Sequence, residues 1–117
     1  MRQRPFGRTG LLVSERSFGA WAIGGASYGA VPAQAALEAL ARAEALGCNF
    51  VDTAAVYGDS EALLGRFLAG RRDRWIVASK YSGQPQGMTA LVEEQLLRLG
   101  TDHIDLYQIH WAPRGRE

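Results

Sequence analysis

The sequence predicts an α/β protein in which short parallel strands alternate with helices. Three predicted helices each end at a glycine, and an apolar segment typical of a strand follows each of these glycines. The predicted strands begin roughly 26 to 32 residues apart, which is the spacing of successive strand–helix units. Because such units join parallel strands through right-handed crossovers, we expect four parallel strands connected by three helices.

The individual elements follow from turn residues and apolar patterns. Two short apolar pieces around Gly7 and Gly10 predict a β-hairpin between Arg4 and Ser14. Strands are then expected at residues 17–21, 49–52, 75–79 and 104–109. Helices are expected from Pro32 or Ala33 to Leu46, from Asp59 or Ser60 to the residue before Gly70, and from Met88 or Thr89 to the residue before Gly100. Their apolar faces are formed by Ala36, Leu37, Leu40, Ala43, Leu63, Leu64, Phe67, Leu68, Val92, Leu96 and Leu99.

Composition narrows the class of protein. The chain has 117 residues, which is the length of one domain, and is 47% hydrophobic and 21% charged, as is typical of a soluble protein. Its formal net charge of +1 provides no strong field for nucleic acid or an anionic membrane, so we expect neither as a partner. Cys48 is the only cysteine, which suits a reducing compartment. No long apolar run and no leader pattern is present, so we expect a cytoplasmic protein.

Lys80 is the only lysine in a chain that contains 13 basic residues of the lysine and arginine type. Arginine stays protonated, whereas lysine is a compact charge that can lose its proton. A single lysine at the end of the predicted strand 75–79 therefore indicates a chemical role, although an arginine-rich chain also contains few lysines by chance.

Polar side chains follow the predicted strands at the points where parallel strands gather functional groups. Asp52 ends the second strand and Tyr57 lies in the loop beyond it, Lys80 ends the third strand, and His110 ends the fourth. Each has a structural alternative: a loop cap for Asp52, a turn aromatic for Tyr57 and a core histidine for His110. The carboxyl ends of neighbouring parallel strands lie along one edge of the sheet, which we call the rim. The meeting of all four residues on this rim favours the functional interpretation.

These four groups match the chemistry of carbonyl reduction. An ammonium close to a phenol favours loss of the phenolic proton, and Asp52 can hold Lys80 in place by an ion pair. His110 can donate a hydrogen bond to a carbonyl oxygen or relay a proton to Tyr57. A positioned acid with a second donor forms an electrophilic site for a carbonyl. No side chain supplies a hydride, so the site requires a cofactor.

Four stretches of the chain resemble the aldo-keto reductase family. They are residues 18–25 (FGAWAIGG), 49–61 (NFVDTAAVYGDSE), 96–102 (LLRLGTD) and 104–111 (IDLYQIHW). The resemblance implies an NADPH-dependent reductase of a small carbonyl substrate on a (β/α)8 TIM barrel, of which this chain would form the N-terminal half. We therefore expect residues 1–117 to form one truncated domain of this type.

The resemblance also implies roles for individual residues. Tyr57 would be the general acid, Lys80 the charge that tunes it, Asp52 the partner of Lys80, and His110 the donor that orients the carbonyl. Gly19, Ala20 and Trp21 would border the nicotinamide together with Asp52 and Lys80, and Trp21 and Trp111 would form apolar walls around the substrate beside Tyr57 and His110. Two positions depart from the family pattern: Ala20 stands where threonine is common, and Gln95 where serine is common.

The length of the chain raises a physical question, because a barrel of this type needs roughly 250 residues. Four parallel strands alone leave two open edges and an uncovered apolar face. Two copies could therefore associate edge to edge into a closed barrel. Two alternative functions remain open at this stage: a catalytically incompetent half-barrel or binding remnant, and a different barrel enzyme in which Lys80 forms a Schiff base.

Overall fold

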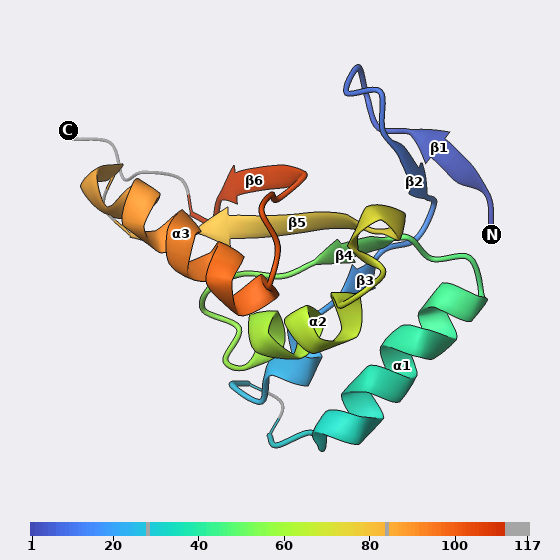
Figure 1. The fold of residues 1–117 in the computed structure, drawn as a ribbon, viewed down its shortest axis with the longest axis horizontal. Coiled ribbons are helices and arrows are strands. Elements are labelled where there is room, and N and C mark those ends of the chain that lie inside the picture. The colour runs from blue at the N-terminus through green and yellow to red at the C-terminus, as the bar shows by residue number, and fades with distance from the viewer. Residues whose placement is uncertain (28, 84, 112–117) are drawn as a thin grey trace.

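The computed structural model describes residues 1–27, 29–83 and 85–111, and its fold is shown in Figure 1. The described elements, in chain order, are β1 (Gln3–Pro5), β2 (Leu12–Ser14), β3 (Phe18–Gly19), η1 (Ala22–Gly24), α1 (Ala33–Ala45), β4 (Phe50–Asp52), α2 (Ser60–Leu68), η2 (Arg72–Arg74), β5 (Ile76–Tyr81), η3 (Pro85–Gly87), α3 (Met88–Leu99) and β6 (Leu106–Ile109).

The structure contains a two-stranded sheet and a four-stranded sheet, and the four-stranded sheet is the framework of the fold. It has the order β3-β4-β5-β6, and each of its three strand pairs is parallel. The predicted arrangement of four parallel strands joined by three helices is therefore confirmed. β5 is the longest of these strands and continues two residues beyond Ser79, the end predicted from the sequence. Lys80 therefore lies inside β5, where its register partner in β6 is Gln108.

The predicted hairpin is also confirmed. β1 and β2 pair antiparallel, with Gln3 opposite Ser14. The Asn49 side chain accepts a hydrogen bond from the backbone N–H of Ser14 at 2.7 Å and donates one to the carbonyl of Leu12 at 3.0 Å. The ring of Phe6 packs edge-on against Phe50, with 5.6 Å between ring centroids. These contacts hold the hairpin at the start of β4, opposite the end of the strand that carries Asp52.

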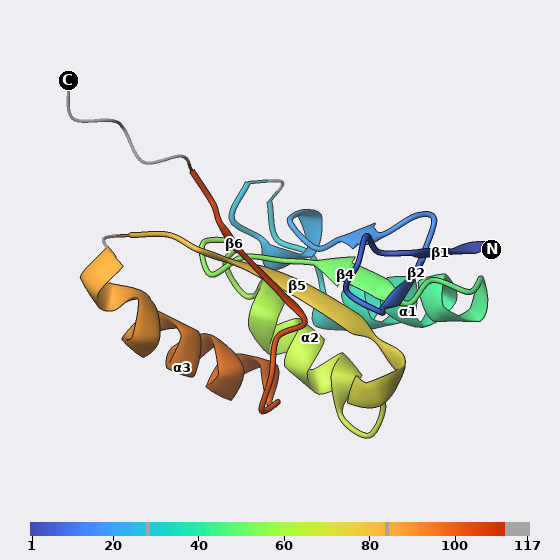
Figure 2. The ribbon, with the colours of Figure 1, turned by 90° about the horizontal axis from the view of Figure 1, so that it is seen from above.

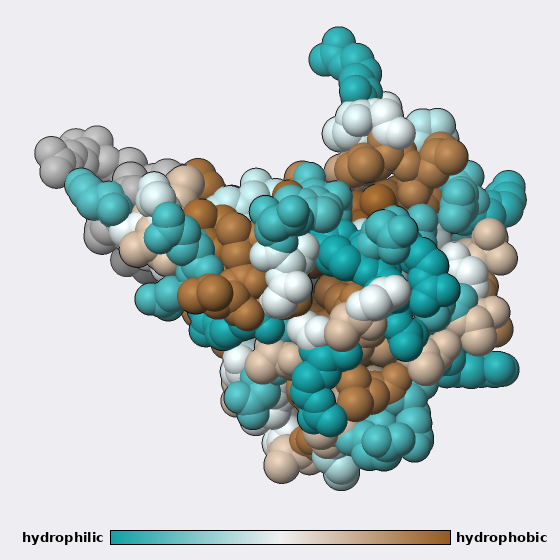
Figure 3. Space-filling view, in the orientation of Figure 1, coloured by the Kyte–Doolittle hydropathy of each residue, from teal (hydrophilic) through white to brown (hydrophobic). Residues whose placement is uncertain are grey.

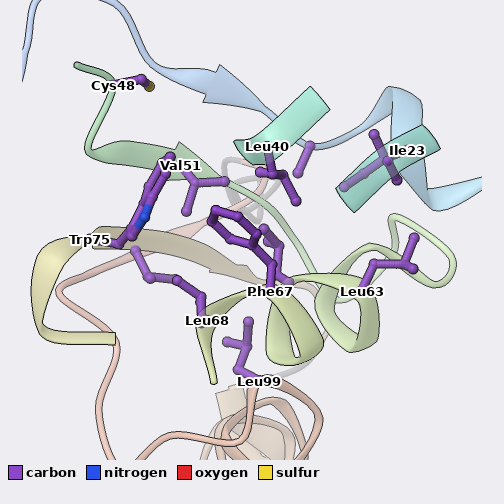
Figure 4. Close-up of a cluster of buried hydrophobic side chains, with 13 residues drawn as sticks. Ile23, Leu40, Cys48, Val51, Leu63, Phe67, Leu68, Trp75 and Leu99 are labelled. Atoms are coloured by element: carbon purple, nitrogen blue, oxygen red, sulfur yellow. The ribbon is translucent and has the colours of Figure 1, made fainter. Parts of the chain in front are cut away.

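One apolar core lies between the helices and the sheet. Phe67 of α2 packs edge-on against Trp75, with 5.5 Å between ring centroids, and Figure 4 shows Phe67 among side chains from α1, β4 and α2. Leu40 and Leu64 are completely buried. Figures 1 and 2 show α2 and α3 on the same side of β5. The predicted core faces are largely correct, although Val92 and Leu96 of α3 are only half-buried and Gln95 takes the buried position between them.

The start of α2 differs from the expectation that Asp59 or Ser60 caps the helix. The Asp59 side chain makes no capping hydrogen bond. The Ser60 hydroxyl is buried and pairs with the Thr53 hydroxyl at 2.8 Å. This bond ties the first residue of α2 to the residue that follows β4, because both hydroxyls lack access to water and satisfy each other.

The residue after Ser60 in α2, Glu61, is a buried acid. The Glu61 side chain is 2% exposed, and within the described ranges neither of its carboxylate oxygens has a hydrogen-bond partner. Burial raises the pKa of Glu61, and the guanidinium of Arg98, 3.9 Å away, offsets part of this shift.

Among the described residues, no helix has the length and apolar character needed to cross a bilayer.

Two leucine substitutions test the assignment of the core. Leu64→Ala should lower the free energy of unfolding by about 2–5 kcal/mol, because it empties a fully buried site in the packed layer. Leu97→Ala should change it by only about 0.5 kcal/mol, because Leu97 is 82% exposed on α3. Urea unfolding of both variants measures the difference. Equal losses would contradict the placement of Leu64 in the core.

Candidate active site

The ammonium of Lys80 is the centre of the candidate site. Its Nζ donates hydrogen bonds to Asp52 Oδ2 at 2.7 Å and to the carbonyl of Thr53 at 2.8 Å. Asp52 is the last residue of β4, so the ion pair spans the ends of two neighbouring strands. The Lys80 side chain is only 14% exposed. A largely buried charge of this kind requires a partner, and the two oxygens provide it.

Tyr57 lies directly beside this ion pair. The Nζ atom of Lys80 is 5.0 Å from the centroid of the Tyr57 ring. The loop that carries Tyr57 is held against the segment around η1, because the N–H of Asp59 donates to the carbonyl of Gly24 at 2.9 Å. The two backbones approach closely: a Cβ on Gly24 would lie 1.7 Å from the carbonyl oxygen of Tyr57, and one on Gly58 would lie 2.2 Å from that of Gly24. Both positions therefore need glycine, and Gly58 also has a positive φ of 56°.

His110 reaches the same place from the end of β6. Its backbone N–H donates to the carbonyl of Tyr81 at 2.9 Å, which continues the β5–β6 pairing by one residue. Its ring stands edge-on to the ring of Tyr57, with 5.6 Å between centroids and 88° between planes. The Nδ1 atom lies 3.3 Å from the Ser82 hydroxyl, and the ring stacks on Trp111 at 4.1 Å.

Electrostatics at the rim favour a neutral imidazole. Burial lowers the pKa of His110 below its usual range, the nearby Lys80 ammonium lowers it further, and the Asp52 carboxylate partly opposes both effects. A neutral imidazole has one N–H donor and one acceptor nitrogen. His110 can therefore donate a hydrogen bond to a neutral oxygen without carrying a charge of its own.

The segment Gly19, Ala20 and Trp21 completes the described rim. The N–H of Ala20 donates to the carbonyl of Asp52 at 2.8 Å, so this segment is registered to β4. A Cβ at Gly19 would have no neighbouring atom within 4 Å, which leaves open space above this position. The Trp21 ring lies 6.3 Å from the Tyr57 ring, and its Nε1 donates to Ser27. Trp21 and Trp111 are 46% and 62% exposed, so both present apolar surface at the rim.

The structure thus brings together Asp52, Tyr57, Lys80 and His110, with Trp21 and Trp111 at the sides. Three contributors were missed by reasoning from the sequence. The Thr53 carbonyl binds Lys80 through the backbone and leaves no signal in the side-chain pattern. Ser82, next to His110, could have been found from its position one residue past the end of β5. Gln95 stands behind β5 and is buried, whereas glutamine on a helix ordinarily indicates an exposed face.

Other candidate sites are less suited to this chemistry. In the part of the chain that the structure describes, no group of three or more histidine, cysteine or acidic residues could hold a metal ion. A cavity of about 390 Å³ lies beside the Tyr57 loop, lined by Gly24, Ala30, Val31, Asp59 and their neighbours. None of the four predicted catalytic side chains lines it. The exposed rim around Lys80 is therefore the better candidate for the reaction site.

The rim fits one end of a nicotinamide cofactor. The open space over Gly19 and the exposed ring of Trp21 could accommodate a flat ring close to Tyr57 and Lys80. The pyrophosphate end is different. The described arginines lie on the hairpin, on α1 to α3 and on the segments that lead into strands, and the ion pairs that they form with described residues lie away from the rim. Within residues 1–27, 29–83 and 85–111, Lys80 is the cation at this rim.

Fold and rim together define a (β/α) barrel protein with a lysine, a tyrosine and a histidine at the carboxyl ends of its strands. The model of the aldo/keto reductase family matches residues 17–115. The chain belongs to the aldo-keto reductase family.

Individual relatives agree with this assignment. The chain is 35% identical to aldo-keto reductase YhdN of Bacillus subtilis, over 88% of this chain and 36% of that protein. It is 37% identical to 6-dehydroglucose reductase of Novosphingobium aromaticivorans, over 92% of this chain and 40% of the relative. The holo form of an aldo-keto reductase from Bacillus halodurans superposes with a TM-score of 0.81 at 32% identity, covering 93% of this chain and 40% of the other. The chain thus spans well under half the length of these relatives.

A further similarity bears on the cofactor. The structure of an aldo-keto reductase from Klebsiella pneumoniae in complex with NADPH superposes with a TM-score of 0.78 at 30% identity. The alignment covers 92% of this chain and 38% of the Klebsiella protein.

Titration of His110 tests the electrostatics of the rim. Lys80→Met should raise the pKa of His110, because it removes a cation that disfavours the imidazolium, and Asp52→Asn should lower the pKa further. The rise in Lys80→Met should be incomplete, because burial makes the larger contribution. NMR titration in a His103→Gln background leaves one histidine signal to follow. A fall of the pKa in Lys80→Met would contradict the described geometry.

Proposed function

We propose that this chain carries the reaction site of an NADPH-dependent aldo-keto reductase that reduces an aldehyde or ketone. One observation supports this most strongly: Lys80 Nζ is 2.7 Å from Asp52 Oδ2 and lies over the ring of Tyr57, 5.0 Å from the ring centroid. An ammonium fixed beside a phenol can stabilise the phenolate that forms when the phenol gives its proton to a carbonyl oxygen. When bound, NADPH would supply the hydride that no side chain can provide.

Tyr57 acts as the general acid in this proposal. It gives its phenolic proton to the carbonyl oxygen as the carbonyl carbon gains the hydride, so the product is an alcohol. The Lys80 ammonium stabilises the phenolate that remains, and Asp52 together with the Thr53 carbonyl keeps the ammonium in position. Because these groups are partly shielded from water, their charges interact more strongly than they would in bulk solvent.

His110 and the two tryptophans orient the substrate. The neutral imidazole of His110 stands edge-on to Tyr57 and can donate a hydrogen bond to the same carbonyl oxygen. Trp21 and Trp111 lie on either side of the Tyr57–His110 pair, at ring distances of 6.3 Å from Tyr57 and 4.1 Å from His110. They form apolar walls that favour an aldehyde or ketone with an apolar or aromatic substituent.

Two substitutions test the assigned roles. Tyr57→Phe should reduce turnover of 4-nitrobenzaldehyde with NADPH by about 100-fold or more, because the proton donor is lost. Lys80→Met should cause a comparable loss while leaving the acid in place. The consumption of NADPH measures both rates, and Leu46→Ala, at an exposed position at the end of α1, is the surface control. Undiminished turnover in either site variant would contradict the roles.

The alternative of a catalytically incompetent half-barrel remains distinguishable. Lys80, the cation at the described rim, is already paired with Asp52, so binding of NADPH by this chain alone is the decisive measurement. Titration that follows NADPH fluorescence should show binding at sub-millimolar concentration if the proposal holds. Absence of NADPH binding in that range would favour the catalytically incompetent half-barrel. Borohydride trapping of an aldehyde on Lys80 would instead favour Schiff-base chemistry.

Three further properties belong to this proposal. Residues 1–117 form one domain; the protein is cytoplasmic, which suits the free thiol of Cys48; and two copies associate through the open edges of the sheet. Support for association comes from the topology, because β3 and β6 each have a neighbouring strand on one side within the described chain. In Figure 3 apolar surface is also exposed over α3, where Leu97 is 82% exposed.

A substitution at the edge of β6 tests association. The N–H of His110 donates toward β5, so by alternation the N–H of Ile109 points to the free edge. Ile109→Pro should therefore block pairing with a second copy without removing a bond to β5. Sedimentation should show a dimer for the unaltered chain and for Ile109→Ala, and a monomer for Ile109→Pro. A well-folded monomer of the unaltered chain would rule out association.

A further inference from the structure

We propose that Gln95 is a positioning residue that fixes Lys80 from behind the sheet. This inference rests on the function proposed above, because it assigns a structural support to the ammonium that lies over the Tyr57 ring. Gln95 lies on α3 and is completely buried. It does not contact the candidate substrate site.

The Gln95 amide joins three elements. Its Nε2 donates to the Ser79 hydroxyl at 2.9 Å and to the backbone carbonyl of Lys80 at 3.2 Å. Its Oε1 accepts from the Tyr107 hydroxyl at 2.6 Å. Both donors of the amide are therefore used and one lone pair is satisfied. A flipped amide would place Oε1 against the Lys80 carbonyl oxygen, so the orientation is determined by the contacts themselves.

The carbonyl of Lys80 needs this bond for a topological reason. The carbonyl of Ala78 accepts a hydrogen bond from the N–H of Thr53 at 2.9 Å, on the side of β5 that faces β4. Alternate carbonyls of a strand point to the same side, so the carbonyl of Lys80 also points that way. β4 ends at Asp52, and the chain then turns away. The Gln95 side chain thus donates to the Lys80 carbonyl the hydrogen bond that a longer β4 would have provided.

The same amide also fixes β6 relative to β5. Ser79 and Tyr107 are register partners in the β5–β6 pair, and Gln95 binds the side chains of both. Burial raises the pKa of the Tyr107 phenol, and the negative charge of Glu61 raises it further, so the hydroxyl stays a donor. Lys80 follows Ser79 by one residue and His110 follows Tyr107 by three. The network therefore lies directly beneath the two strands that carry the ammonium and the imidazole.

Lys80 provides the readout, because it is the only lysine in the chain. Protein grown with isotope-labelled lysine has one labelled side chain, and its ε-methylene should show a through-space NMR contact to the Tyr57 ring. Gln95→Met keeps the volume and removes every bond of the amide, so the contact should be lost and the signal should shift. Tyr107→Phe keeps both donors and should cause a smaller shift.

Two controls separate positioning from stability. Leu99→Val lies on the same helix and perturbs the core at a residue outside the polar network. It should therefore lower the urea midpoint of unfolding and leave the Lys80 signal unchanged. In the unaltered protein, the Gln95 side-chain amide protons should exchange slowly with solvent. An unchanged Lys80 signal in Gln95→Met would overturn the proposal. If that variant does not fold, fast exchange of the Gln95 amide would overturn it, and slow exchange would support it.

The steady-state kinetics of Gln95→Met provide an independent test of the same proposal. Gln95→Met should lower kcat by about tenfold or more with little change in KM, because the reacting groups are displaced while substrate contacts remain. If the unaltered chain shows no turnover, the proposed function fails, and the NMR measurements still decide the role of Gln95.

Discussion

The rim depends on one constraint: a largely buried ammonium must keep its anionic partner. Lys80 is 14% exposed, and the 2.7 Å bond to Asp52 is possible only because β4 and β5 end side by side in parallel register. A shift of one residue between these strands would turn one of the two side chains to the opposite face of the sheet. The elements that hold the register, from the core around Phe67 to the hydrogen bond between Thr53 and Ser60, therefore also preserve the charge distribution at the rim.

Much of this arrangement could be predicted from the sequence, because it follows from periodic patterns. Glycines after helices and apolar segments at regular spacing predicted the order of elements, and the rule that parallel strands gather polar residues at their carboxyl ends predicted the meeting of Asp52, Tyr57, Lys80 and His110. Strand ends were less predictable. β5 extends to Tyr81 because β6 pairs with its last part, from Ala78 to Tyr81, and this pairing is not visible in a single strand's sequence.

Buried polar groups were the main features that the sequence did not reveal. Gln95 occupies a core position because it can satisfy Ser79, Lys80 and Tyr107 at once, and such mutual satisfaction depends on distances between three elements. Ser60 was expected to cap the helix, but its hydroxyl forms a hydrogen bond with the hydroxyl of Thr53. Glu61 is buried with the Arg98 guanidinium 3.9 Å away, and within the described chain its carboxylate oxygens have no hydrogen-bond partner. In each case tertiary contacts override the local preference of the residue type.

The contact between Gly24 and the Tyr57–Gly58 turn limits how this protein can be altered. Neither glycine has room for even one additional carbon, since the opposing carbonyl oxygens lie 1.7 Å and 2.2 Å from where it would stand. A library intended to broaden substrate range should therefore leave these two codons fixed and diversify the outward-facing neighbours Trp21 and Trp111. Variation at the glycines would move the tyrosine itself, so selection would recover folding defects in place of new specificities.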